Sequence, residues 1–155
     1  MMIYKSKLIL LPENPADPAF QPAEAGEVRI SCRRSDGTYL NYRVAASLGD
    51  SIHCDDCERL LANDATEISI RHPDGSEMSV HIQNGLYSVG IIDEEAGIIY
   101  YYDNKDGEEG AAELHGETFP LHMISKNKEL VCTMIGDFIR TGRPSEAADW
   151  TVEDF

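Results

Sequence analysis

The segment His53-Cys54-Asp55-Asp56-Cys57 combines residue types that could do chemistry. A structural zinc site takes four ligands, commonly as two cysteine pairs, and this segment supplies half of such a set. As a redox pair the two thiols would lie at the N-terminus of a helix, where the helix dipole lowers a thiol pKa. The negative charges of Asp55 and Asp56, which lie between the cysteines, disfavour the thiolate form. We interpret the segment as a helix start with Cys57 in the core. A small metal-binding or redox protein that uses Cys54 and Cys57 is the alternative.

The remaining candidates for catalysis form no known pattern. The five histidines have neither the His-x-x-x-His nor the His-Glu-x-x-His spacing of metal-binding helices. We find no nucleophile elbow and no glycine-rich phosphate loop. The sequence therefore predicts a protein that is not an enzyme and that uses no metal or cofactor.

Acidic residues are the stronger signal. Asp and Glu number 28 against 13 Lys and Arg, which gives a formal net charge of −15. Such a surface repels nucleic acids and anionic lipids, and it attracts cationic partners. Two acidic loops flank the strand expected at Gly97–Tyr102, and this strand carries an aromatic side chain suited to an interface. The predicted partner-binding residues are Asp93, Glu94, Glu95, Tyr101, Asp103, Asp106, Glu108 and Glu109. The competing interpretation is that these loops are merely solvated.

Apolar alternation and turn residues predict the elements that position these loops. The expected fold is α+β: an antiparallel β-meander sheet of about five to seven strands with two main helices packed on it. We treat 1–155 as a single domain, with N-terminal strands and a proline-rich loop over 1–49 and a core over 50–155. The expected strands are Ile3–Leu11, Glu27–Arg34, Thr38–Ala46, Glu67–His72, Glu77–Ile82, Leu86–Ile92, Gly97–Tyr102 and Glu113–Phe119, and the expected helices run from Asp50 or Ser51 to about Asn63 and over Lys126–Arg140.

The chain contains no long apolar run. The four residues Leu8–Leu11 are fewer than the roughly 7–15 of a signal peptide. No stretch approaches the roughly 20 apolar residues of a membrane span. We therefore expect a cytoplasmic protein without membrane contact, and its cysteines are expected to be reduced thiols.

The C-terminal part carries a recognisable series of features: a helix ending in Leu60-Leu61, two strands joined through Asp74-Gly75, the strand pair Leu86–Ile92 and Ile98–Tyr102, then a long amphipathic helix. That helix is followed by Thr141-Gly142-Arg143-Pro144 and, a few residues later, by Trp150. Over about residues 50 to 152 the chain resembles the first large family of immunity proteins of bacterial polymorphic toxin systems. Members of this family close with a Thr-Gly-Arg-Arg-Pro-like turn and a tryptophan, and this chain has one arginine fewer.

The resemblance implies an α+β domain that binds and neutralises a cognate toxin, with the toxin's C-terminal domain as its partner. Such toxins include nucleic-acid deaminases and nucleases, whose basic clefts the acidic loops could cover. The family offers no catalytic residues to carry over. Pro144 is expected to end the helix, and Trp150 is expected to hold the tail against the sheet. Binding away from the toxin's active site, or a secretion-accessory interaction domain without a toxin partner, are the alternatives.

Overall fold

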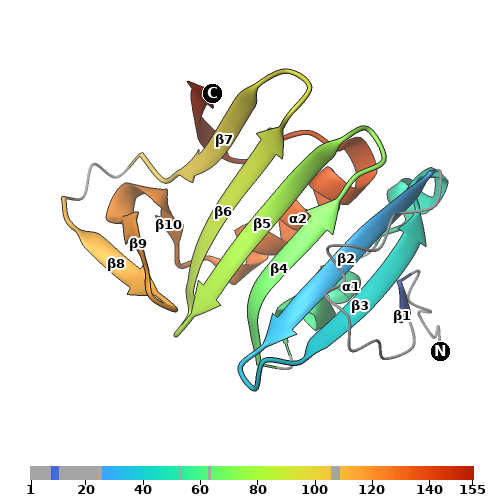
Figure 1. Cartoon of the computed structure of the whole chain (residues 1–155), viewed down its shortest axis with the longest axis horizontal. Helices are drawn as coiled ribbons and strands as arrows, with labels where there is room; N and C mark the ends of the chain where they lie inside the picture. Colours follow the sequence, from blue (N-terminus) through green and yellow to red (C-terminus); the bar gives the residue numbers. More distant parts are fainter. Residues whose placement is uncertain (1–7, 11–25, 53, 63, 106–108) are drawn as a thin grey trace.

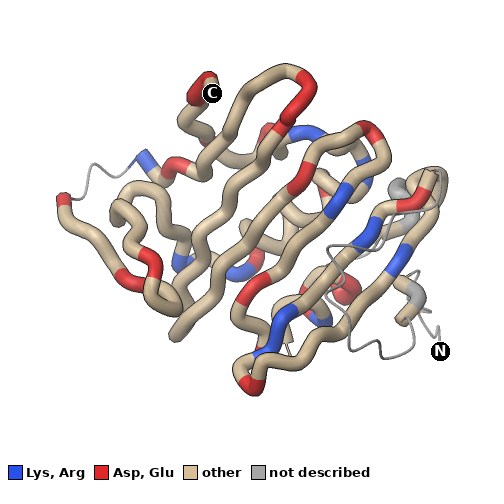
Figure 2. The backbone as a smooth tube through the Cα atoms, viewed as in Figure 1, with Lys and Arg blue, Asp and Glu red and all other residues tan. Residues whose placement is uncertain are grey.

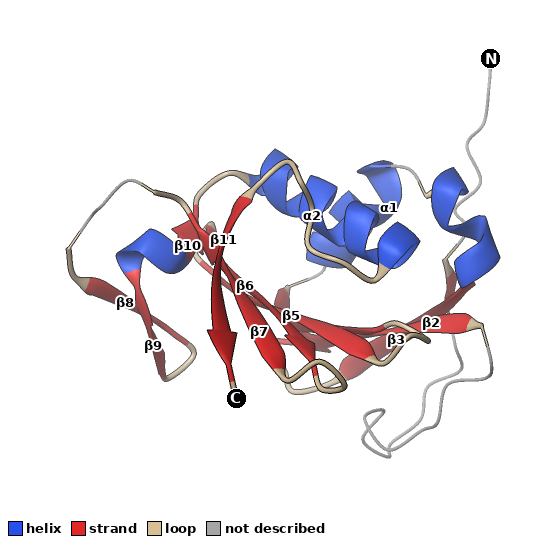
Figure 3. Cartoon of the chain, turned by 90° about the horizontal axis from the view of Figure 1, so that it is seen from above, coloured by secondary structure: helices blue, strands red, loops and turns tan. Residues whose placement is uncertain are grey.

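The computed structural model describes residues 8–10, 26–52, 54–62, 64–105 and 109–155. Within these ranges a large antiparallel sheet carries its helices on one face, as Figures 1 and 3 show. The strands are β1 (Ile9–Leu10), β2 (Glu27–Arg34), β3 (Tyr39–Ala45), β4 (Ala65–Arg71), β5 (Ser76–Gln83), β6 (Leu86–Asp93), β7 (Ile98–Asp103), β8 (Ala111–Leu114), β9 (Glu117–Pro120), β10 (Ile124–Ser125) and β11 (Asp149–Asp154); the α-helices are α1 (Cys54–Leu61) and α2 (Lys128–Thr141), and the 3-10 helices are η2 (Ala46–Ser51) and η3 (Leu121–Met123).

The central strands β4 to β7 form the predicted meander, each paired with its neighbour in sequence. Tight turns make this possible. Asn84 and Gly85 join β5 to β6 with φ values of 52° and 76°, the left-handed conformation that matches the twist of a two-residue hairpin. The α+β fold with a meander sheet and two main helices is thus confirmed, and the described sheet contains nine strands because β1, β10 and β11 join it.

The sheet departs from a simple meander at β2, which lies between β3 and β4. The chain therefore crosses from β3 to β4 through η2 and α1, over the face that the helices cover. The sequence predicted one helix from Asp50 or Ser51 onward, and this start is wrong: η2 ends at Ser51 and α1 begins at Cys54. Ile52 lies between the two helices and is buried in the core.

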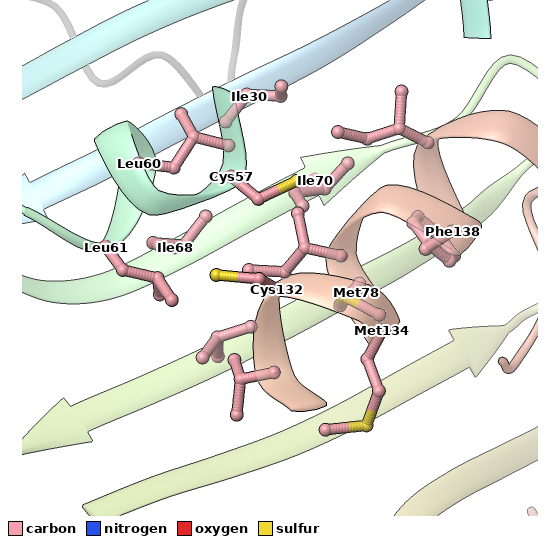
Figure 4. Packing of buried hydrophobic residues seen from close by; sticks show 14 of the residues in the cluster. Ile30, Cys57, Leu60, Leu61, Ile68, Ile70, Met78, Cys132, Met134 and Phe138 are labelled. Carbon is pink, nitrogen blue, oxygen red and sulfur yellow. The ribbon is translucent and has the colours of Figure 1, made fainter. Parts of the chain in front are cut away.

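The core fills the space between the sheet and the two α-helices (Figure 4). Apolar residues alternate along β2, β4 and β5 with polar residues on the opposite face, as the period of a half-buried strand requires. Helix α2 begins at the cap Asn127, whose side chain accepts a hydrogen bond from the N–H of Leu130 at 3.2 Å. The largest fully buried side chains include Ile30, Leu60, Ile68, Ile70, Met78, Met134 and Phe138.

The outer edge of β6 is shared between two strands. β7 pairs with Gly90–Asp93, whereas β10 pairs with Tyr87 and Ser88. β11 then pairs along the whole of β7, from Asp149 opposite Asp103 to Asp154 opposite Ile98. The sequence predicted only a packed tail here, and in the structure that tail is the last strand on this side of the sheet.

The segment between β7 and β10 leaves the sheet and forms a small hairpin of β8 and β9. The sequence predicted a single strand over Glu113–Phe119, and this is wrong. His115 and Gly116 have φ values of 50° and 86°, so the chain reverses there. Glu113 and Glu117 consequently lie on different strands. None of the described helices combines the length and apolar character that crossing a membrane demands.

Candidate partner-binding surface

Asp93, predicted to contact a partner, is already engaged within the chain. Its carboxylate accepts a hydrogen bond from the N–H of Ala96 at 3.1 Å, which caps the β6–β7 turn. The same carboxylate lies 3.5 Å from the guanidinium of Arg143. Its side chain is only 17% exposed. These contacts indicate that Asp93 shapes the turn on which its two acidic neighbours stand.

Asp103 is likewise held by internal contacts. It accepts hydrogen bonds from the Lys105 N–H at 2.9 Å and from the Thr151 hydroxyl at 2.8 Å. The ammonium of Lys105 lies 3.5 Å away and the His122 ring 3.6 Å away. Two hydrogen bonds hold the pKa of the Asp103 carboxyl below its ordinary value; the one from the Lys105 N–H has the larger effect and the one from the Thr151 hydroxyl the next largest. Asp103 therefore joins β7 to β11 at the end of both strands.

The other predicted residues divide into two places. Glu94 and Glu95 are exposed in the β6–β7 turn, and Glu109 is exposed at the opposite end of β7. Tyr101 is half-buried and lies opposite Gly90. Because its neighbours Tyr100 and Tyr102 face the core, Tyr101 faces the side of the sheet away from the helices. Asp106 and Glu108 lie outside the described residues. The two acidic loops thus lie at opposite ends of one strand and form no single patch.

The structure instead brings a second group of acids to the β6–β7 turn. Glu153 and Asp154 of β11 lie opposite Ile99 and Ile98, at the start of β7. The N–H of Phe155 donates to the carbonyl of Gly97 in the turn itself, at 3.0 Å. Figure 2 shows acidic positions at both the turn and the C-terminal end. We call the surface formed by Ile92, Glu94, Glu95, Val152, Glu153, Asp154 and Phe155 the β11 corner.

The β11 corner is also apolar. Ile92 is 38% exposed, Val152 54% and Phe155 66%, and they account for three of the five large exposed hydrophobic side chains among the described residues. Ile92 and Glu153 lie on the open face of the sheet, and Val152 and Asp154 lie on the helix face. Acidic and apolar side chains at one sheet edge are suited to binding a protein surface that carries both cations and apolar groups. Sequence reasoning missed Glu153 and Asp154; the alternating β-formers around Thr151 and Val152 were the available signal.

The turn that ends α2 lies beside the β11 corner, because its Arg143 contacts Asp93 of the β6–β7 turn. Gly142 adopts φ 68°, and a Cβ placed on it would lie 2.8 Å from the ring Nδ1 of His72 and would also collide with Asp74. The buried Ser76 hydroxyl lies 2.9 Å from the Gly142 carbonyl and donates to it or to Asp74. The turn is therefore packed directly against the β4–β5 hairpin, and a side chain larger than that of glycine would have to displace the Asp74 or His72 side chain.

Trp150 connects this turn to β11. Its indole N–H donates to the carbonyl of Ser145 at 2.9 Å, and the Ser145 hydroxyl bonds to Asp137 of α2 at 2.5 Å. The Trp150 ring meets Tyr102 edge-on, with centroids 6.4 Å apart. The prediction that Trp150 holds the tail against the sheet is borne out by these contacts, although the side chain is only half-buried.

The cysteine segment lies far along the sheet from the β11 corner. Cys57 is buried where α1 meets α2, near Gly136, as Figure 4 shows for Cys57 and Cys132. The side chain of Cys54 and the whole of His53 lie outside the described residues. Burial raises the pKa of the Cys32 thiol to about 12. In the part of the chain that the structure describes, no three His, Cys, Asp or Glu side chains come together as a metal site.

Comparison with known proteins informs the fold. No family model matches the chain, and no curated protein matches it. The chain is similar to a solved structure described as a hypothetical protein from Neisseria gonorrhoeae, with a TM-score of 0.56. The match covers 81% of this chain and 96% of that chain at 15% sequence identity. At this identity the likeness shows the fold alone, and the resemblance of residues 50–152 to immunity proteins stays a prediction.

Proposed function

We propose that this chain is an immunity protein, which binds a basic surface of a cognate toxin domain inside the cell and blocks it. The observation that carries the proposal is the β11 corner, where four exposed carboxylates, those of Glu94, Glu95, Glu153 and Asp154, lie at the same end of the sheet as three exposed apolar side chains, on both faces of its edge. A toxin that acts on nucleic acid needs a cationic cleft for phosphates. The corner offers that cleft negative charge together with apolar contact area.

Long-range charge supports the same function. A net charge of −15 speeds the approach of a cationic partner and disfavours nucleic acid as a competitor. Fast capture suits an inhibitor, because the toxin must be bound before it reaches its substrate. Attraction of this kind falls with ionic strength, since the screening length is about 8 Å at physiological salt.

The proposal revises which acids make contact. Asp93 and Asp103 are occupied by internal hydrogen bonds and cations, so they are assigned to shaping the surface. Glu94 and Glu95 of the original set remain, joined by Glu153 and Asp154 from β11. Glu109 lies at the opposite end of β7, and we assign it no contact. Tyr101 lies opposite Thr151, on the same sheet face as Glu153, so we keep it as a candidate contact at the border of the corner.

A protection assay tests the function. The chain is co-expressed in bacteria with the toxin domain encoded beside its own gene, and survival is compared with an empty vector. We expect protection, and we expect it to be weakened when Glu94, Glu95, Glu153 and Asp154 are all changed to lysine. A control with Glu58, Glu67, Glu113 and Glu129 changed to lysine alters net charge equally and should still protect.

Three further results would decide against the proposal. Wild-type protein that gives no protection, although it is folded and expressed, rejects the immunity function. Protection that disappears when Cys54 and Cys57 are both changed to serine, in a protein that still folds, would favour cysteine chemistry instead. Equal loss of protection in both lysine variants would show that bulk charge rather than the β11 corner is responsible.

A further inference from the structure

We propose that the outer edge of β11 is a docking strand, which pairs by backbone hydrogen bonds with an extended basic segment of the partner protein. This inference rests on the proposed function, because it states how the partner would bind. β11 is the last strand on its side of the sheet, and none of the described strands pairs with its outer edge. An open edge presents N–H and C=O groups to any chain that can lie beside it.

The register identifies the backbone groups that point outward. The Phe155 N–H donates to Gly97 of the β6–β7 turn, so residue 155 directs its backbone groups toward β7. Hydrogen-bonding positions alternate along an antiparallel strand, so Glu153 and Thr151 also face β7. Val152 and Asp154 therefore point their N–H and C=O groups away from the sheet. No hydrogen bond within the described chain occupies these outward groups.

The side chains define what the incoming segment must carry. Glu153 and Asp149 are exposed on the sheet face that the helices leave open, and the half-buried Thr151 lies between them on the same face. Val152 and Asp154 are exposed on the other face. A partner strand that pairs here places alternate side chains against these two rows. Lysine or arginine opposite Glu153, and an apolar residue opposite Val152, is the complementary pattern.

Charge argues for a basic partner rather than a second copy of this chain. If two β11 edges paired with each other, each copy would bring Asp149, Glu153 and Asp154 to the shared ladder, so six carboxylates would lie along two adjoining strands. Like charges on adjoining strands are destabilising. An edge that is acidic and also exposes Val152 resists self-pairing, yet it remains open to a strand of opposite charge.

Two peptides of equal charge test backbone pairing directly. One short peptide alternates lysine with valine, and the other alternates lysine with proline, which cannot form a strand ladder. We expect the lysine–valine peptide to bind about tenfold more tightly, the free-energy equivalent of one or two hydrogen bonds. Bound peptide should shift the backbone amide resonances of Val152 and Asp154 and slow their hydrogen exchange. Equal affinity for the two peptides, or shifts confined to other residues, would overturn the proposal.

One substitution separates backbone pairing from charge. Val152→Pro removes an outward N–H while leaving the β7 ladder intact, and proline is tolerated at edge positions whose N–H faces solvent. We expect it to weaken lysine–valine peptide binding about tenfold. Val152→Thr keeps the N–H and the β-branched shape, so it should weaken binding by about threefold at most. The proposal fails if a folded Val152→Pro protein binds this peptide as wild type does.

A second variant covers the possibility that Val152→Pro does not fold. Glu153→Lys combined with Asp154→Lys should lower affinity for the lysine–valine peptide about tenfold at low salt, with a smaller effect at about 0.5 M salt. Glu58→Lys with Glu129→Lys is the control of equal net charge, and its effect should be smaller. Equal losses in the two pairs would reject the site.

The protection assay distinguishes failure of the docking strand from failure of the proposed immunity function. If wild-type protein protects and folded Val152→Pro protects equally well, the docking strand is rejected and the immunity function stands. If wild-type protein does not protect, the function fails, and peptide binding alone then decides whether the β11 edge captures basic strands. Sedimentation of the protein alone should show no self-association through this edge; a dimer abolished by Val152→Pro would assign the edge to a second copy.

Discussion

The carboxylate of Asp93 lies 3.5 Å from the guanidinium of Arg143, which ties the β6–β7 turn to the turn that ends α2. The two residues are fifty positions apart in the sequence, yet they lie at the same end of the sheet. The arginine of the Thr141-Gly142-Arg143-Pro144 turn thus has a partner within the chain. The contact places Asp93 among the residues that hold the surface in shape.

Asp93 and Arg143 are expected to differ in their contribution to stability. Arg143→Ala should cost about 0.5 kcal/mol or less, because the guanidinium is largely exposed to solvent. Asp93→Ala also removes the cap on the Ala96 N–H and should cost about 1 kcal/mol. Chemical denaturation measures both. Arg143→Ala should leave protection against a toxin unchanged, and Asp93→Ala should weaken it less than the change of Glu94, Glu95, Glu153 and Asp154 to lysine does. An equally large loss of protection in folded Asp93→Ala would return this residue to the binding surface.

Gly142 is expected to be far less tolerant than an ordinary turn glycine. Gly142→Ala forces a Cβ against Asp74 and His72 in addition to straining the positive φ, and should cost about 2–4 kcal/mol. Gly116→Ala is the matched control, since Gly116 also has positive φ but open space around it, and should cost about 1 kcal/mol. Thermal unfolding of both variants measures the difference. Similar losses would show that strain alone matters at Gly142.

Trp150 should contribute through ring packing and through its indole N–H. Trp150→Ala is expected to cost about 2–3 kcal/mol, less than for a fully buried tryptophan. Trp150→Phe keeps an edge contact with Tyr102 but loses the hydrogen bond to Ser145, and should cost about 1 kcal/mol. Denaturant titration of the three proteins tests the order. A melt unchanged by Trp150→Ala would contradict the assignment of the tail to the sheet.

Asp103 makes stability depend on pH in the acidic range. Because its pKa is lower in the folded protein than in the unfolded chain, its contribution is fully present above the unfolded value near 4. The contribution is lost as pH falls through the folded pKa. Asp103→Asn should therefore make the free energy of unfolding less sensitive to pH below about 4 than in wild type. An Asp103→Asn protein whose pH dependence in this range equals that of wild type would contradict the assignment.

The meander and α2 could be predicted because their signals are local. Alternation fixes which face of β5 is buried, and Asn84-Gly85 fixes the reversal that follows it. The end of α2 was predictable from Gly142 and Pro144 for the same reason. The reversal at His115 was not, because a histidine with positive φ leaves no signature in an otherwise strand-like sequence.

The candidate surface depended on pairing that sequence patterns do not specify. Glu153 and Asp154 reach Glu94 and Glu95 only because β11 pairs with β7 over its full length. Conversely, Asp93 and Asp103 lie in acidic runs that look solvated, yet each is engaged by a residue distant in sequence. A run of acids shows charge, but only tertiary contacts show which carboxylates are already used.

Asn104 links the two ends of the segment between β7 and β10, which we call the excursion and which carries the β8–β9 hairpin. Its backbone N–H donates a hydrogen bond to the carbonyl of His122 at 2.7 Å. Its side-chain NH2 group donates to the carbonyls of Leu121 and Ile124 at 3.0 Å each. Both ends of the excursion are thus fastened at one point beside β7 and β10. The hairpin turn is also held to β5, because the His115 N–H donates to the Gln83 side chain at 2.7 Å. A connection fastened in this way can change its length elsewhere without altering the spacing of the strands it joins. The protein therefore has a position where new sequence could be inserted while the sheet keeps its shape.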